Sequence, residues 1–141
     1  MHRDTAIAAI SSASGMRGVP FEAAYSASKF AVCGFAEAAA RELGPRGIRI
    51  NVVCPFYVRT PMTDAALIEK EELTGITVEE SYKMEGDQVP LGRVAEPEDI
   101  AELLYFLVSD ASRYVTGAII PISTHCGYGP VLSSYDEKDV E

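Results

Sequence analysis

The stretch AISSASGMRGVPFEAAYSASKF, residues 9–30, decides the fold, because it joins an apolar run to an alanine-rich run through small and turn-forming residues. The apolar run, residues 5–11, ends in serines and is typical of a buried strand. The alanine-rich residues 22–43 predict a long helix, which ends at Gly44 and Pro45 because proline cannot continue it. A strand followed directly by a long helix is the building unit of a parallel sheet.

The rest of the chain repeats this alternation. GIRINVV, residues 47–53, and TGAIIPIS, residues 116–123, predict two more strands. Pro97 opens a segment whose apolar residues recur at helical spacing, with acidic residues in its first turn. Residues 60–92 are too long for a simple connection, and we expect part helix and part mobile loop there. The order predicts an α/β layered fold, whose functional sites lie beyond the carboxyl ends of the strands.

Composition narrows the function classes. The 141 residues fit one domain, and 48% hydrophobic and 23% charged residues are ordinary values for a globular protein. A formal net charge of -9 argues against binding to nucleic acid or to an anionic membrane, since both need clustered lysine and arginine. Small molecules or other proteins are therefore the expected partners.

Cysteine usage and the N-terminal sequence indicate the compartment. Cys33, Cys54 and Cys126 are odd in number and form no C-x-x-C pair, which argues against a disulfide framework and favours a reducing compartment. His125 beside Cys126 lacks a second ligand cluster, so no metal site is predicted. The start of the chain has about six weakly apolar positions, fewer than a signal-peptide core, and no run approaches the roughly 20 apolar residues that span a bilayer. The sequence predicts a cytoplasmic protein.

Three side chains in residues 9–30 suggest proton-transfer chemistry. Tyr25 and Lys29 are four residues apart, which places them on one helix face with Cβ atoms about 5–6 Å apart. A tyrosine hydroxyl ordinarily has a pKa of about 10, and a nearby ammonium group favours the phenolate. Ser12, at the end of the preceding strand, could hydrogen-bond the same substrate oxygen. Such a trio suits the interconversion of a carbonyl and an alcohol, with the hydride supplied by a cofactor.

A plainer interpretation applies to each motif taken alone. A single Y-x-x-x-K is most often an ordinary helix surface, and serine pairs mostly serve turns and caps. Several motifs taken together favour the functional interpretation over the plain one. The segments ISSASG, YSASK, IRINVVCP, VRTPM, GRVAEPEDIAELLYFLVSD and YVTGAIIPI occur in an order and at a spacing that resemble the later half of the short-chain dehydrogenase/reductase family. The resemblance covers residues 5–122.

The resemblance implies a partial Rossmann-like, doubly wound parallel sheet, made of the last three strands and their helices. By the resemblance, Ser12 polarises the substrate oxygen, Tyr25 is the general acid/base, and Lys29 assists Tyr25 and holds the nicotinamide ribose. The cofactor-binding residues implied are Tyr25, Lys29, Pro55, Val58 and Thr60. The cofactor is NAD or NADP, with no preference indicated, and the substrate is a secondary alcohol or a ketone.

The same resemblance implies a domain organisation. Residues 1–127 correspond to the C-terminal half of a Rossmann-like oxidoreductase domain, with a substrate-lid insertion at about 60–92, and residues 128–141 form an acidic tail. The helix at 22–43 resembles one that pairs with its symmetry mate, which implies a homo-oligomer.

The sequence also departs from the family. Phe56 replaces the glycine that usually follows Pro55, and PISTHCGYG stands where the family continues into Asp-Gly-Gly. No glycine-rich phosphate-binding turn and no Asn-Asn-Ala-Gly segment occurs in the sequence. We therefore expect a truncated product or fragment whose first strand exposes an open edge and apolar faces. The alternative is a non-catalytic half-domain that acts as an interaction module with a full-length relative.

Overall fold

The computed structural model describes residues 5–122 and contains one parallel sheet. The strands, in spatial order, are β1 (Thr5–Ile10), β2 (Ile48–Pro55) and β3 (Ile119–Ile122). β1 pairs with β2 from Thr5 opposite Ile48 onward, and β2 pairs with β3 from Val52 opposite Ile119 onward. The predicted α/β fold with a parallel sheet is confirmed.

Four α-helices and three short 3-10 helices complete the described part of the chain. They are η1 (Ala13–Gly15), α1 (Ala23–Leu43), η2 (Gly44–Arg46), α2 (Pro61–Thr74), α3 (Val78–Gly86), α4 (Pro97–Val108) and η3 (Asp110–Ser112). The long helix predicted at 22–43 and the helix beginning at Pro97 are confirmed. Residues 60–92 form two helices, α2 and α3, with short connections.

Two predicted strand boundaries were wrong. β2 continues through Cys54 and Pro55, because Pro55 still pairs with the last residue of β3. β3 begins at Ile119 instead of residue 116. The residues before it approach β2 through a turn at Gly117, which has a φ of 70°. The Gly117 N–H donates a hydrogen bond to the main-chain oxygen of Ile50.

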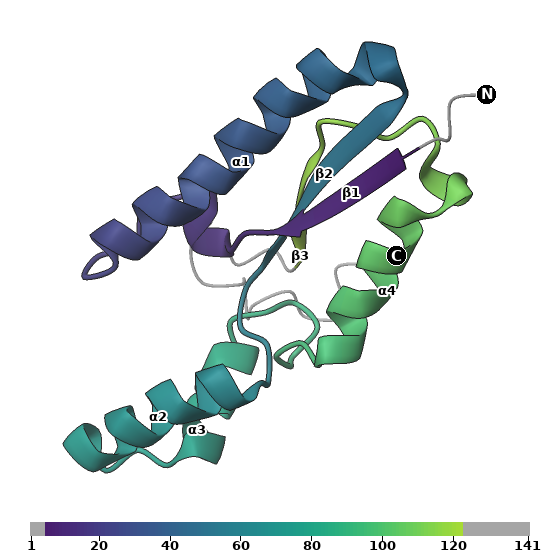
Figure 1. Cartoon of the computed structure of the whole chain (residues 1–141). Coiled ribbons are helices and arrows are strands. Elements are labelled where there is room, and N and C mark those ends of the chain that lie inside the picture. Colours follow the sequence, from purple (N-terminus) through teal and green to yellow (C-terminus); the bar gives the residue numbers. More distant parts are fainter. Residues whose placement is uncertain (1–4, 123–141) are drawn as a thin grey trace, which may run out of the picture.

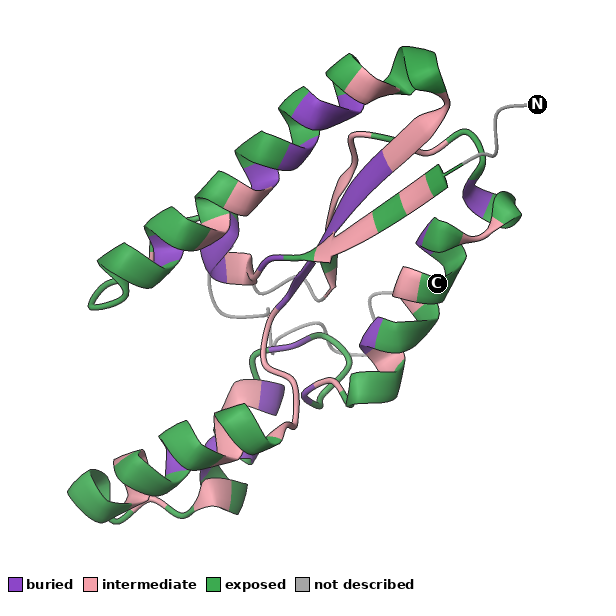
Figure 2. Ribbon diagram, in the orientation of Figure 1, coloured by how far each residue is buried: buried purple, intermediate pink, exposed green. Residues whose placement is uncertain are grey.

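The strand side chains alternate between two helical layers. Ile50, Val52 and Cys54 of β2 face α1 and form one core cluster with its buried small residues, while Val53 faces α4 and packs with its apolar side chains. Figure 1 shows α1 and α4 on opposite sides of the sheet, and Figure 2 shows the buried stripe of α1 turned toward the strands. The central strand β2 is covered on both faces, as expected for a parallel sheet.

Arg49 of β2 fixes the end of α4. Its guanidinium donates to the main-chain oxygens of Leu107, Ser109 and Val115 and to the hydroxyl of Ser112, at 2.9–3.2 Å. A cation at a helix C-terminus satisfies carbonyl groups that have no partner within the helix. The strand therefore holds the helix and the turn that leads to β3.

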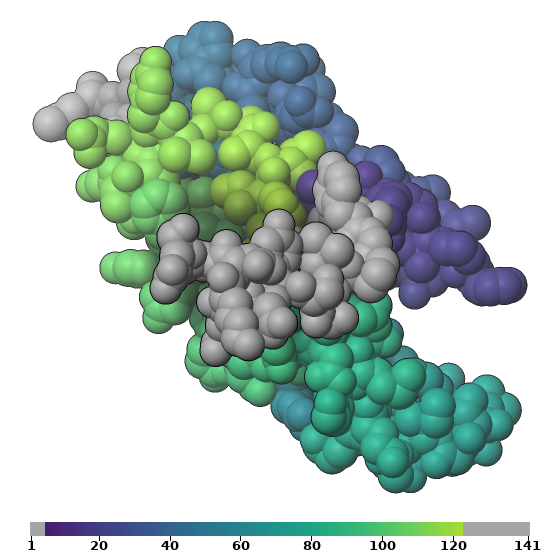
Figure 3. Space-filling model, turned by 180° about the vertical axis from the view of Figure 1, so that it is seen from behind, coloured from purple at the N-terminus to yellow at the C-terminus, as the bar shows by residue number. Residues whose placement is uncertain are grey.

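β1 lies at one edge of the described sheet. Its outer edge has no strand beside it within residues 5–122, and Ile7 and Ile10 are 45% and 50% exposed. The expected open edge and exposed apolar side chains are present. In the space-filling view of Figure 3, α2 and α3 project from the rest of the molecule. They pack on one another around Leu67 and Tyr82 and contact Val94.

Some predictions fall on residues that the structure does not describe. The acidic tail at 128–141, the segment 123–127 and the pair His125 and Cys126 lie outside the described residues. Within residues 5–122, no group of three or more potential metal ligands occurs. No helix in that part of the chain is long and apolar enough to cross a membrane.

Candidate active site

Ser12 and Pro55 lie at the carboxyl edge of the sheet, because β1 and β2 are parallel and end side by side. Ser12 is the N-cap of η1, and its Oγ accepts a hydrogen bond of 3.1 Å from the main-chain N–H of Ser14. The oxygen is used as an acceptor, so the hydroxyl hydrogen of Ser12 can still be donated to a ligand. Ser12 is only half-buried, which leaves this group accessible.

The preceding serine has a different place. Ser11 is buried, and its hydroxyl donates a hydrogen bond of 2.9 Å to the main-chain oxygen of Lys29 on α1. Gly15 makes this contact possible. A Cβ atom added at Gly15 would lie 2.8 Å from the Lys29 oxygen and would also overlap the Ser11 hydroxyl. The end of β1 and the first turns of α1 are therefore in direct contact.

The loop between η1 and α1 is tied down on both sides. The Ser14 hydroxyl donates to the Glu22 carboxylate at 3.1 Å, and the Val19 N–H donates to the Ser26 hydroxyl at 3.3 Å. Between them, Phe21 has a φ of 67° and a fully exposed side chain. A left-handed backbone at a bulky residue is uncommon, so the surrounding bonds hold the loop in this conformation.

Tyr25 and Lys29 form a pair on α1, as the four-residue spacing predicts. The Nζ atom of Lys29 lies 5.4 Å from the centroid of the Tyr25 ring, within the range of a cation–π contact. Tyr25 is 46% exposed. In the described part of the chain, no hydrogen bond engages the Tyr25 hydroxyl and no ion pair engages the Lys29 ammonium. Both groups are available to a ligand.

The residues after β2 form a separate segment. Val58 makes a β-bridge with Ala95, and its carbonyl accepts a hydrogen bond from the Thr63 hydroxyl at 2.8 Å. Thr60 is the N-cap of α2 and accepts from the Thr63 N–H at 3.3 Å. Within residues 5–122, no hydrogen bond joins Val58 or Thr60 to the Tyr25–Lys29 pair. The structure thus brings Ser12 beside the first turns of α1, and it places Val58 and Thr60 on the path from the sheet edge to α2.

Arg59 connects this segment to α3. Its guanidinium makes two hydrogen bonds to the Glu79 carboxylate, at 2.7 and 3.1 Å, and lies 4.1 Å from the centroid of the Tyr82 ring. The Tyr82 hydroxyl in turn donates to Asp64 of α2 at 2.7 Å. The hydrogen bonds from Arg59 lower the pKa of Glu79. The motif VRTPM does not single out Arg59, because its partners Glu79 and Tyr82 lie about 20 residues further along the chain.

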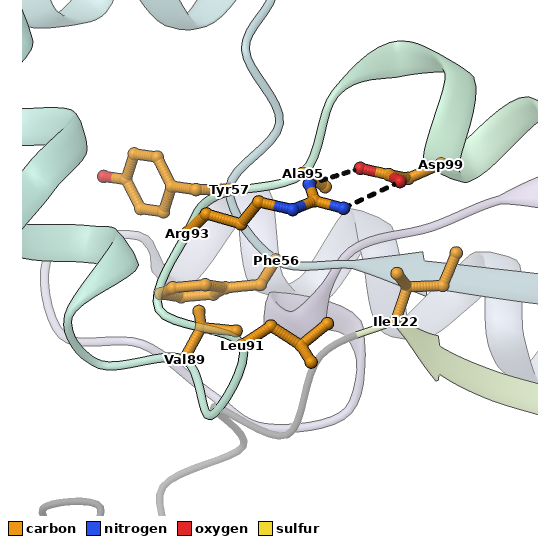
Figure 4. Close-up of a pocket in the computed structure, with 8 residues that line it drawn as sticks. All are labelled: Phe56, Tyr57, Val89, Leu91, Arg93, Ala95, Asp99 and Ile122. Carbon is orange, nitrogen blue, oxygen red and sulfur yellow. Dashed lines mark hydrogen bonds and ion pairs between the residues drawn. The ribbon is translucent and has the colours of Figure 1, made fainter.

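A pocket of about 240 Å³ lies next to the same segment, and Figure 4 shows its lining. It is lined by Phe56, Tyr57, Val89, Leu91, Arg93, Ala95, Asp99 and Ile122. The side chain of Phe56 points toward Val89 and Leu91, whereas the hydroxyl of Tyr57 points away from them. Burial, followed by the charges of Glu85 and Glu22, raises the pKa of Tyr57. Phe56 therefore contributes to an apolar pocket at the sheet edge.

The sequence places Ser11 at the end of the first strand but gives it no role, and it does not single out Gly15 or Arg59. The glycine four positions after the first serine was a usable signal, because a close approach between two elements often requires a glycine. The Arg59 cluster offered no such signal.

Known proteins resemble this chain in sequence. Residues 1–124 match the family described as Enoyl-(Acyl carrier protein) reductase. The 3-oxoacyl-(acyl-carrier-protein) reductase of Thermotoga maritima is 40% identical over 120 residues, which cover 85% of this chain and 44% of the relative. The chain spans about half the length of the curated relatives it matches.

Solved structures resemble it as well. A short-chain dehydrogenase family protein from Francisella tularensis matches with a TM-score of 0.81 and 35% identity, over 84% of this chain and 49% of that protein. A variant of actinorhodin polyketide ketoreductase, solved with NADPH, matches with a TM-score of 0.75 and 34% identity, over 83% of this chain and 45% of that protein.

Proposed function

Because the chain belongs to the short-chain dehydrogenase/reductase family, we propose that it carries the catalytic part of an NAD- or NADP-dependent oxidoreductase that interconverts a secondary alcohol and a ketone. The resemblance stated from the motifs is confirmed at the level of the family. The observation that supports the activity is the Lys29 ammonium beside the Tyr25 ring on a helix that is hydrogen-bonded to the end of β1. Two of the named relatives are reductases, and one of these was solved with NADPH.

In the proposed mechanism, Tyr25 gives a proton to the substrate oxygen during reduction and takes it back during oxidation. The positive charge of Lys29 lies beside the Tyr25 ring, where it can stabilise negative charge that develops during the reaction. Ser12 donates its hydroxyl hydrogen to the same oxygen and stabilises the charge that develops there. The nicotinamide cofactor, when bound, supplies or accepts the hydride.

The residues present fit a nicotinamide nucleotide. The Tyr25 hydroxyl and the Lys29 ammonium have no competing polar partner in the described residues, so they can bond to ribose hydroxyls. Pro55, Val58 and Thr60 are the proposed contacts to the nicotinamide, and hydrogen bonds from Thr63 join Val58 and Thr60 to the first turn of α2. The choice between NAD and NADP is left to experiment.

The α2–α3 segment is the proposed substrate lid within a half-domain formed by residues 1–127. It lies beyond the carboxyl edge of the sheet and is joined to the proposed cofactor segment through Arg59 and Glu79. Homo-oligomer formation through α1 is proposed on the exposure of Phe30 and Phe35, which are 45% and 73% exposed.

A second candidate function rests on the edge of the sheet. An open strand edge with exposed apolar side chains can pair with a strand of another chain. The chain would then act as a non-catalytic interaction module with a full-length relative. Co-expression with such a relative, followed by purification through a tag on the short chain, distinguishes the two. A stable complex in which the full-length relative keeps its catalytic rate supports the interaction module.

The first experiment is a titration of the 141-residue chain with NADH and with NADPH, followed by nicotinamide fluorescence. We expect saturable binding that Tyr25→Phe and Lys29→Ala each weaken by about tenfold, which is 1.4 kcal/mol. Tyr105→Phe is the matched control, because it removes the same hydroxyl from an exposed site on α4. Absence of saturable binding at millimolar cofactor, or equal loss in the control, would contradict the proposal.

A further inference from the structure

Two thiols meet in the core beneath the candidate site. The Sγ atoms of Cys33 on α1 and Cys54 on β2 are 3.8 Å apart, and the two residues are 5% and 1% exposed. Both are free cysteines. Neither belongs to the proposed proton-transfer residues, and the motifs of the sequence assign no role to them.

Small side chains bring the thiols together. Cys33 shares its core cluster with Ala36, Ala39 and Ala40 of α1, and their short side chains let the helix lie close to β2. Cys54 precedes Pro55 at the carboxyl end of the strand. Cys33 follows Lys29 by about one helical turn, so the thiol pair is close to Lys29 along α1.

Burial, followed by the neighbouring Cys33, raises the pKa of Cys54 to about 12, while the nearby Ser11 and Ser12 act in the opposite direction. Cys54 is therefore a neutral thiol near neutral pH. The Ser11 hydroxyl donates its hydrogen to the Lys29 oxygen, which ties the end of β1 to α1 beside this thiol pair.

We propose that Cys33 and Cys54 form an oxidation site in which an intramolecular disulfide joins α1 to the carboxyl end of β2. The two sulfurs must approach by about 1.7 Å to reach the S–S bond length of about 2.05 Å. This movement pulls the helix segment that carries Lys29 toward the strand. The disulfide thereby shifts the α1 residues of the candidate site relative to the end of β2.

The oxidant is a peroxide. Local opening of α1 exposes one of the two sulfurs to solvent and peroxide, and this sulfur loses its proton. As the thiolate it attacks a peroxide oxygen and breaks the O–O bond, which leaves a sulfenic acid and releases water once the departing hydroxide takes a proton. The second sulfur then attacks the sulfenic sulfur, and its proton leaves with the displaced hydroxide as a second water. Two thiols are oxidised to one disulfide, and one hydrogen peroxide is reduced to two waters.

The test uses the 141-residue chain with Cys126→Ser, so that the two core thiols are the only cysteines in the sequence. The protein is treated with hydrogen peroxide, denatured, alkylated and digested, and the peptides are identified by mass spectrometry. We expect loss of both alkylatable thiols, a linked peptide that contains Cys33 and Cys54, and recovery of both thiols with dithiothreitol. Thiols that stay alkylatable, single cysteines oxidised to sulfinic acid, or links between chains would each overturn the proposal.

A second measurement tests the effect on the helix. Hydrogen exchange of the α1 amides around Lys29 is compared between the oxidised and the reduced protein, with Cys33→Ala treated in the same way. We expect exchange to slow by about tenfold in the oxidised protein, because the disulfide restrains local opening of α1, and to stay unchanged by peroxide in Cys33→Ala. Unchanged exchange in a protein shown to be fully cross-linked would refute the coupling to the candidate site.

Discussion

The hydroxyl of Ser11 and the main-chain oxygen of Lys29 are joined by a hydrogen bond of 2.9 Å, which ties the end of β1 to the first turns of α1. Ser12 follows Ser11 in the chain, and the Lys29 ammonium lies 5.4 Å from the centroid of the Tyr25 ring. The Ser11–Lys29 hydrogen bond therefore fixes the position of Ser12 relative to the Tyr25–Lys29 pair. A change at this contact should therefore affect both stability and the proposed chemistry.

Gly15→Ala tests that contact. The new methyl group would lie 2.8 Å from the Lys29 oxygen and would overlap the Ser11 hydroxyl, so η1 and α1 must separate. We expect the free energy of unfolding to fall by about 1–3 kcal/mol, measured by urea denaturation. Gly18→Ala is the matched control, because no atom lies within 4 Å of its added Cβ. Equal effects of the two substitutions on the free energy of unfolding would show that the close contact at Gly15 does not contribute to stability.

Arg49→Lys should destabilise the protein although it keeps the charge. A lysine cannot reproduce the planar guanidinium that reaches three carbonyls and the Ser112 hydroxyl. Carbonyl groups left without a partner should cost about 1–3 kcal/mol in thermal or urea unfolding. Arg41→Lys on the exposed face of α1 serves as the control, with an expected change below about 0.5 kcal/mol. A comparable loss in both variants would contradict the role of Arg49.

Asp99 should make stability depend on pH in the acid range. Its hydrogen bonds from Arg93 and from the Glu96 N–H lower its pKa from 3.8 to about 2. A lowered pKa in the folded state stabilises the protein above a pH of about 3.8, and this contribution disappears as the pH falls through about 2. The difference in melting temperature between the wild type and Asp99→Asn should therefore shrink toward zero over that range.

Asp110→Asn is the control for this pH series, since Asp110 is exposed and has no ion pair in the described residues. A wild-type advantage over Asp99→Asn that stays constant down to the lowest pH would rule out the titration of Asp99 as its source.

Arg59→Lys should loosen α3 without unfolding the domain. The substitution removes the two-bond contact to Glu79 and the stacking on Tyr82. Because this ion pair is exposed, we expect global stability to change by less than about 1 kcal/mol. Hydrogen exchange should nevertheless become faster in Val78–Gly86. Lys83→Arg, at another exposed ion pair of α3, is the control, and faster exchange there too would count against Arg59.

The strands and the long helix could be predicted because their signals are local. β2 is rich in β-branched residues, and α1 ends where Gly44 and Pro45 indicate. The candidate pair Tyr25 and Lys29 likewise follows from helical spacing alone. These features need no knowledge of distant contacts.

Other features depend on contacts between distant segments and could not be predicted. The acceptors of Arg49 lie far along the chain on α4 and the turn after it. Cys33 and Cys54 show no pairing in the sequence, and only the packing of α1 on β2 brings their sulfurs together. The end of β2 was misplaced because proline usually closes a strand, whereas Pro55 lies opposite Ile122 in the ladder.

The parallel sheet has a consequence for how fast the chain folds. Thr5 pairs with Ile48, and Val52 pairs with Ile119, so each ladder forms only after a long intervening segment has been brought into place. The loss of chain entropy comes before the gain from pairing, and folding rates fall as the sequence separation of contacts rises. This chain should therefore fold more slowly than a helical bundle of the same length, and it should expose β1 to other chains for longer while it does so.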